Sequence, residues 1–95
     1  MTNYTNGANF ERRVKRYYEE LGWFVVRSAG SHGVADLICI RRLKGSSKPE
    51  IILVQCKTYG HWDEKQSLIA LAKKLHVKAV YAYREGKKLI LEPLV

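Results

Sequence analysis

The fold is decided by residues 33–40, Gly-Val-Ala-Asp-Leu-Ile-Cys-Ile, and by residues 51–57, Ile-Ile-Leu-Val-Gln-Cys-Lys. Both stretches are rich in β-branched and aliphatic residues, which predicts two buried strands. Each also carries polar groups that a buried strand avoids, namely Asp36 in the first and Gln55 and Lys57 in the second. A buried charge is tolerated only when it is paired, hydrogen-bonded or bound to a metal. Because Asp36 is one of only two aspartates in the chain, its position indicates a functional site.

Helical and strand patterns continue on both sides of these stretches. Helical spacing relates four residues, Phe10, Val14, Tyr17 and Leu21, which precede a glycine that can end a helix. A second apolar helix face, from Leu68 to Leu75, follows Asp63, which is a suitable N-cap. The order is helix, three strands, helix and two strands, so helices can cover both faces of one mixed sheet in an α/β domain. The expected helices are 7–21 and the segment that follows Asp63, and the expected strands are 23–28, 34–43, 50–57, 77–83 and 88–91.

Length and charge narrow the function. The 95 residues make one small domain, 1–95, in which we expect the polar residues 1–6 to be flexible. Seventeen lysines and arginines against nine acidic residues give a net charge of +8 and a pI near 9.7. An excess of this size favours a polyanionic partner, most often nucleic acid. The alternative at this point is a soluble protein that is merely basic.

Neither a membrane span nor a secretory signal is predicted. The longest apolar run is far shorter than a bilayer requires, and the first residues lack the pattern of a signal peptide. We therefore expect no membrane contact and a cytoplasmic location. Cys39 and Cys56 lie in predicted strands without the spacing of a metal cluster, which predicts free thiols acting as small core residues.

Strand pairing brings the misplaced polar groups together. Alternate residues of a strand share a face, so Gln55 and Lys57 point to the same side of the sheet. If the two central strands pair through the polar turn between them, Leu43 lies opposite Glu50, and Asp36 then lies opposite Lys57. The polar groups therefore gather at one end of the sheet. The same parity places both cysteines on the opposite face, away from this site.

Glu11 can join this end of the sheet from the first helix, where it neighbours the buried Phe10. Two acids and a neutral oxygen suit a hard divalent cation such as Mg²⁺, and Lys57 beside them can hold a water or a phosphate oxygen. Such a site can generate hydroxide and stabilise in-line attack on a phosphodiester. Two structural explanations remain open. Asp36 and Lys57 can form an ion pair at a strand end, and a glutamate in a first helical turn often serves the helix dipole.

Taken in order, Glu11, Ala35-Asp36 and Gln55-Cys56-Lys57 resemble the motif of the PD-(D/E)XK nuclease superfamily. Two departures stand out. Ala35 replaces a proline, which is a minor change, and Gln55 replaces the second acid of the motif. A glutamine supplies a neutral oxygen, so the site loses one negative charge and its metal affinity should weaken. An attenuated or inactive enzyme therefore remains open.

Within that superfamily, residues 26–31, Val-Arg-Ser-Ala-Gly-Ser, followed by Gly33 and Asp36-Leu37-Ile38, are similar to archaeal Holliday-junction resolvases. The similarity covers nearly the whole chain, residues 7–91. It implies a restriction-endonuclease-like fold with one mixed five-stranded β-sheet flanked by helices. It also implies a homodimer that cuts two symmetric strands of a four-way DNA junction with Mg²⁺, for which Mn²⁺ is expected to substitute.

The resemblance further implies roles for individual residues. Glu11, Asp36 and Gln55 would bind the metal together with the backbone carbonyl of Cys56, and Lys57 would assist the attacking water. Ser31 matches a serine near the scissile phosphate, which adds it to the catalytic group. Ser28, Ser31 and His32 also flank glycines, so turn chemistry is their structural alternative. The residues expected to contact DNA are Arg12, Arg27, Ser28, Ser31 and His32, of which the two arginines touch phosphates or help to arrange the site.

The sequence thus predicts a magnesium-dependent, structure-selective DNA endonuclease that resolves four-way junctions. Two alternatives remain. One is a non-catalytic nucleic-acid-binding module of the same fold, and the other is a nuclease that acts on flaps, nicks or ends. Five lysines outside the motif are expected to lie on solvated faces and to add a diffuse attraction for DNA: Lys65, Lys73, Lys74, Lys87 and Lys88.

Overall fold

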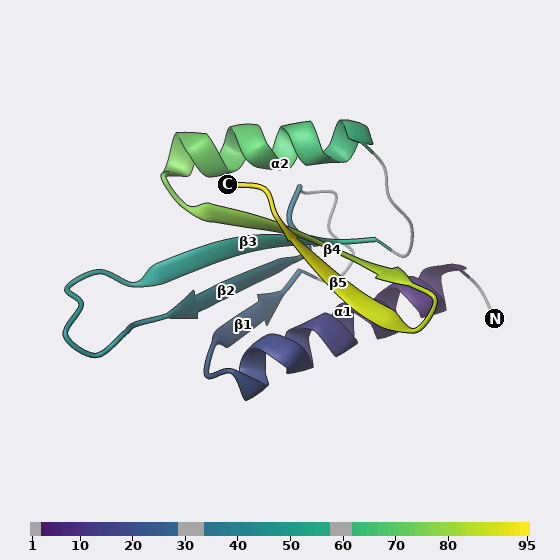
Figure 1. The fold of residues 1–95 in the computed structure, drawn as a ribbon, viewed down its shortest axis with the longest axis horizontal. Helices are drawn as coiled ribbons and strands as arrows, with labels where there is room; N and C mark the ends of the chain where they lie inside the picture. The colour runs from purple at the N-terminus through teal and green to yellow at the C-terminus, as the bar shows by residue number, and fades with distance from the viewer. Residues whose placement is uncertain (1–2, 29–33, 58–61) are drawn as a thin grey trace.

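The computed structural model describes residues 3–28, 34–57 and 62–95. One five-stranded sheet, in the order β1-β2-β3-β4-β5, is antiparallel except for the parallel pair β3–β4. Figure 1 shows α1 on one face of this sheet and α2 on the other. The mixed sheet flanked by helices and the order of elements are confirmed. The elements are α1 (Asn3–Glu20), β1 (Phe24–Arg27), β2 (Leu37–Arg41), β3 (Glu50–Cys56), α2 (Trp62–Leu75), β4 (Lys78–Glu85) and β5 (Lys88–Pro93).

Helix α1 packs on β1, β2 and β3 through a stripe of residues four apart. Phe10, Val14 and Tyr18 are buried on this stripe, whereas Tyr17 and Leu21 of the expected apolar face are 40% and 54% exposed. The buried stripe follows a four-residue spacing to Tyr18, and since Tyr17 also neighbours Val14 on the helix surface, the angle at which α1 packs on the sheet selects Tyr18. The α1 side of the sheet contributes alternate strand residues to the same core, including Val25, Leu37, Cys39, Val54 and Val80.

The helix begins at Asn3, four residues earlier than the sequence predicts. Glu11 therefore lies in the middle of the 18-residue helix rather than in its first turn. The favourable effect of a carboxylate on the helix dipole falls off within the first turn. The dipole therefore does not explain Glu11, and its environment must.

Helix α2 packs on β3 and β4 from the other face. Leu68 and Ala72 are fully buried there against Leu53 and Ala79. Because α2 covers only these central strands, the same face of β1 is left open (Figure 1). No helix in the described parts of the chain is long and apolar enough to cross a membrane.

The register of β2 on β3 differs from the expected one by two residues. Arg41, and not Leu43, lies opposite Glu50, and the Nε of Arg41 donates to Oε1 of Glu50 at 3.2 Å. The connection is longer than the turn that the sequence suggests, because pairing begins only where this ion pair forms. A shift of two residues preserves the face of every side chain. Continued beyond β2, this register places Asp36 opposite Gln55, so the expected pairing with Lys57 is wrong.

Candidate active site

The backbone fixes Asp36 just before β2. Its N–H donates to the carbonyl of Val54 at 2.8 Å, and its own carbonyl accepts from the N–H of Ser28 at 2.9 Å. Its side chain then turns to β3, where Oδ2 accepts from the backbone N–H of Cys56 at 2.8 Å. A carboxylate bonded to a backbone N–H is oriented by a strong, charge-assisted contact. Asp36 is thus held in place by the ends of two strands.

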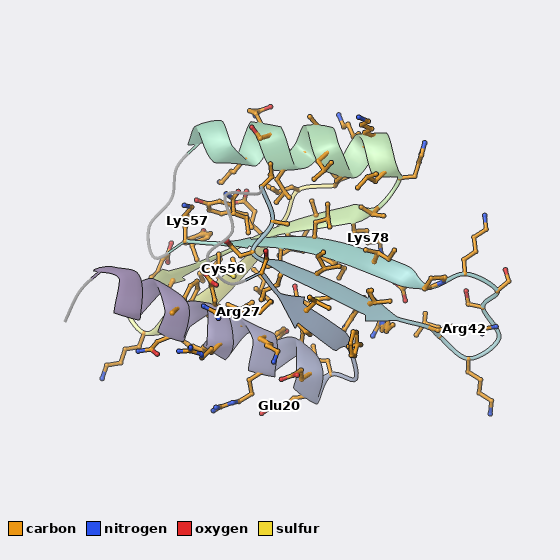
Figure 2. All side chains as sticks on the ribbon, turned by 180° about the vertical axis from the view of Figure 1, so that it is seen from behind. Glu20, Arg27, Arg42, Cys56, Lys57 and Lys78 are labelled. Carbon is orange, nitrogen blue, oxygen red and sulfur yellow. The ribbon has the colours of Figure 1, made fainter. Side chains whose placement is uncertain are left out.

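Glu11 reaches the same region from α1. Its Oε1 accepts from the Nε of Arg27, on β1, at 3.0 Å, and both side chains are about one-fifth exposed, at 20% and 18%. Arg27 lies between α1 and the sheet, close to Cys56 and at the same end as Lys57 (Figure 2). Arg27 is expected either to touch DNA phosphates or to help arrange the site. Its hydrogen bond to Glu11 is compatible with the second role.

The carboxylates of Glu11 and Asp36 repel each other. Burial raises the pKa of Glu11 above its ordinary value, and the neighbouring charge of Asp36 raises it further. Arg27 and Lys57 act in the opposite direction and lower the pKa of Glu11. Two acids that repel each other in a partly desolvated place are stabilised by an added cation.

Gln55 is the next-to-last residue of β3 and is only 6% exposed. Its Oε1 is buried and has no hydrogen-bond partner among the described residues. Leaving a buried acceptor unmet costs about 1–3 kcal/mol, and such a group calls for an explanation such as an ion or an ordered water. A neutral oxygen next to the position of Asp36 is what a cation site requires of this residue.

Cys56 and Lys57 follow at the end of β3. The N–H of Lys57 donates to the carbonyl of Ala82 at 2.9 Å, which continues the pairing of β3 with β4 beyond the strand. Both cysteines are free and buried on the α1 side, as expected, and burial raises the pKa of Cys39 to about 12. Burial raises the pKa of Cys56 as well, with further contributions from Asp36 and Glu11. Cys56 is therefore close to the site, contrary to the expectation that both cysteines lie away from it.

The remaining residues expected at the site divide into two groups. Arg12 and Ser28 are exposed, and Arg12 makes a long contact of 3.5 Å from its NH1 to Oδ1 of Asn9. Ser31 and His32 lie outside the described residues. The structure therefore brings together Glu11, Arg27, Asp36, Gln55, Cys56 and Lys57 at one end of the sheet.

Within the described residues, no three side chains of His, Cys, Asp and Glu converge as a metal cluster. Among the described residues, the two acids that come together here are Glu11 and Asp36. Any further ligand from this part of the chain must be a neutral oxygen, from Gln55 or from the backbone. Hard divalent cations accept amide and backbone carbonyl oxygens beside carboxylates, so the donor set fits one.

A polar cluster next to the site was not predicted. Lys65, expected on a solvated face, is only 9% exposed, and its Nζ lies 3.2 Å from Oε2 of Glu92 and 4.7 Å from the ring centre of Tyr81. Tyr81 is the β4 partner of Gln55 and is fully buried. The spacing of Lys65 from Leu68, three residues on along the same helix face, is the pattern that indicates this burial.

The mixed five-stranded sheet with a helix on each face agrees with the restriction-endonuclease-like fold that the sequence resemblance implies. A family model described as archaeal Holliday junction resolvase (Hjc) matches residues 2–93. The crossover junction endodeoxyribonuclease Hjc of Methanocaldococcus jannaschii is 34% identical over 99 aligned residues, which span 97% of this chain and 69% of that protein. The solved structure of Hjc, a Holliday junction resolvase from the archaeal hyperthermophile Archaeoglobus fulgidus, has a TM-score of 0.64 at 19% identity, over 94% of this chain and 73% of that one. The chain belongs to the archaeal Holliday junction resolvase family.

Proposed function

We propose that the chain resolves four-way DNA junctions by paired phosphodiester hydrolysis, as a homodimer, with a divalent cation held by Glu11, Asp36 and Gln55. Its family makes it an endodeoxyribonuclease of the Holliday junction resolvase type. The observation that supports the assignment of the site is a pair of fixed carboxylates at the end of the sheet, Asp36 held by the N–H of Cys56 at 2.8 Å and Glu11 held by Arg27 at 3.0 Å. A DNA substrate agrees with the cytoplasmic location expected from the sequence.

Mg²⁺ is the cation that we propose, with Mn²⁺ able to replace it. The ligands would be the two carboxylates, Oε1 of Gln55 and the backbone carbonyl of Cys56. The support is the buried Oε1 of Gln55, which lacks a partner among the described residues, beside two carboxylates that repel each other. Oxygen donors of this kind suit Mg²⁺, which demands an octahedral oxygen environment and keeps several waters.

When bound, a divalent cation would supply Lewis acidity for the hydrolysis. The chain's own residues position the reacting groups. The N–H of Cys56 orients the carboxylate of Asp36, and Arg27 holds Glu11 in place at 3.0 Å. The ammonium of Lys57 lies close enough to Glu11 to lower its pKa, so it can also orient a water or stabilise the negative charge of the attacked phosphodiester.

An assay on synthetic DNA tests this function. We expect the protein to cut a four-way junction into paired nicked products with Mg²⁺ or Mn²⁺, to leave a duplex of matched sequence intact, and to cut neither substrate in a chelator. Tight junction binding without cutting under any metal condition would favour the binding module. Equal cutting of flapped, nicked or open-ended DNA would favour the other nuclease alternative.

The open sheet face is our proposed contact between two copies of the chain. Phe24 and Val26 on β1 point to the side that α2 leaves uncovered and are 68% and 43% exposed. A hollow of about 490 Å³ lies on the same side, near the end of α2, and is lined in part by Ile51 and the 52%-exposed Leu75. A second copy is the occupant that symmetric cleavage requires, because a two-fold contact places two equivalent sites on one junction.

Replacing Val26 with aspartate (V26D) should convert a dimer into monomers. Full burial of a side chain such as Val or Phe contributes about 1.5–3 kcal/mol, and a two-fold contact counts each change twice. Sedimentation of the wild type should give the dimer mass at micromolar concentration, and V26D should give the monomer mass. The matched control is Leu21→Asp, which alters an exposed apolar residue just after α1, 54% exposed against 43% for Val26. A monomeric wild type, or a V26D protein that remains dimeric, contradicts this interface.

A further inference from the structure

We propose that a basic groove between α1 and the β4–β5 hairpin binds the sugar-phosphate backbone of one duplex arm of the junction. This inference rests on the proposed function and names a surface outside the cleavage site. The groove has a volume of about 550 Å³ and is lined by Arg13, Arg16, Tyr17, Glu20, Leu89 and Leu91. We call it the α1–hairpin groove.

The first argument is charge. Residues 12–16 and 84–88, which flank the groove, together contain seven of the chain's seventeen basic residues and only one of its nine acids. Among the described residues, Arg16, Arg84, Lys87 and Lys88 take part in no ion pair, and all four are exposed. Cations without internal partners are available for phosphates, and Lys and Arg contacts to phosphates dominate the affinity of proteins for DNA.

The second argument is that the hairpin is held in place. The Nη2 of Arg13 donates a hydrogen bond to the backbone carbonyl of Lys87 at 2.9 Å, which links α1 to the tip of the hairpin. The floor of the groove is firm as well, because Leu89 and Leu91 pack against the core on the α1 side. A surface fixed in this way positions its charges before DNA arrives, which lowers the entropy that binding costs.

The third argument is the position of the groove relative to the cleavage site. The N–H of Lys57 donates a hydrogen bond to the carbonyl of Ala82 on β4. Arg84 follows two residues later on the same strand, about 7 Å away. The tip of the hairpin therefore lies at the same end of the sheet as the site, and it meets α1 at Arg13, near the middle of the helix (Figure 1). A duplex whose phosphate sits in the site can continue along the groove with the same strand or its complement.

The lining of the groove matches a sugar-phosphate backbone. Its arginines present fork-shaped donors to phosphate oxygens. Tyr17, 40% exposed, offers a hydroxyl donor and an apolar ring, and the leucine floor can pack against deoxyribose. Glu20 is the one acid among the residues that line the groove, and it lies at the end of α1, where the basic part of the groove ends. Contacts of this kind carry no base sequence and would hold an arm by its shape and phosphate spacing.

The test is the double replacement K87Q/K88Q, measured in a chelator so that binding is separate from cleavage. We expect the dissociation constant for a four-way junction to rise about tenfold at physiological salt, and the slope of log affinity against log salt to fall by about 1 to 2. The matched control is K73Q/K74Q, which removes the same charge from exposed lysines in the last turn of α2. These lie near the start of β4, at the opposite end of the sheet.

The proposal is overturned if K87Q/K88Q binds the junction as the wild type does, or if K73Q/K74Q weakens binding equally. At saturating protein and with metal, K87Q/K88Q should cut at the wild-type rate, since the replaced residues lie outside the cleavage site. A slower rate at saturation would assign these lysines to cleavage rather than to arm binding. Failure of the proposed function is distinguished separately, because the wild type itself would then not cut the junction with metal.

Discussion

Replacing Asp36 with asparagine should lower junction cleavage by about 10³-fold. The variant should still fold and bind DNA normally. The side-chain oxygen of asparagine can still accept the backbone N–H of Cys56, which the carboxylate accepts at 2.8 Å. The negative charge, however, is lost. A cation in such a site supplies several kcal/mol of transition-state stabilisation, and every 1.4 kcal/mol is about tenfold in rate.

Asp36→Ala separates the charge from the hydrogen bond. This variant should be equally inactive but also less stable by about 1–3 kcal/mol, because the part-buried N–H of Cys56 loses its acceptor. Single-turnover cleavage and urea denaturation measure the two effects independently. Glu50→Gln is the control, since it alters a carboxylate that pairs with Arg41 at the far end of the sheet and should leave cleavage intact. Normal cutting by Asp36→Asn would remove Asp36 from the site.

Strand parity explains why much of the site can be predicted from the sequence. Asp36 and Gln55 stand out because they interrupt apolar runs, and a strand's alternation assigns them to a face whether or not the register is known. The predicted register of β2 on β3 is wrong by two residues. Asp36 and Gln55 still lie on the same face, because a shift of an even number of residues moves no side chain to the other face. The location of the site therefore survives an error that its detailed pairing does not.

Contacts that depend on three-dimensional approach could not be predicted in this way. The bond between Glu11 and Arg27 joins residues sixteen apart, on a helix and a strand, and the orientation of α1 decides it. The burial of Lys65 likewise depends on where α2 crosses β4 and meets Glu92. Local pattern carries no information about such crossings, which is also why helical spacing predicts Tyr17 in the core and the structure buries Tyr18 instead.

Gln55 is the residue for which the sequence and the structure raise the same question. In the motif this position holds an acid, and the chain has a neutral amide that is 6% exposed, with an oxygen that no described residue satisfies. Burying a carboxylate there without a cation would be costly, since the position lies opposite Asp36. We therefore expect the glutamine to keep the metal-free protein more stable and, at the proposed site, to lower the negative charge that would hold a cation.

Gln55→Glu tests this exchange of stability for affinity. Burial and the charge of Asp36 should raise the pKa of the introduced carboxyl in the folded protein. The variant should therefore keep its full stability below the pKa of the carboxyl in the unfolded chain and lose stability as pH rises through the pKa in the folded protein. The metal-free variant should thus match the wild type near pH 4 and be less stable by roughly 2–4 kcal/mol at pH 7. At a concentration of Mg²⁺ or Mn²⁺ one hundred times the variant's dissociation constant, the metal should stabilise the variant by about 2.7 kcal/mol. The same concentration should stabilise the wild type less, because its affinity is weaker, and the variant should need less metal for cleavage. Gln66→Glu, at an exposed position on α2, should change none of these quantities. If Gln55→Glu is as stable as the wild type without metal at pH 7, or gains nothing from metal, Gln55 does not face the cation.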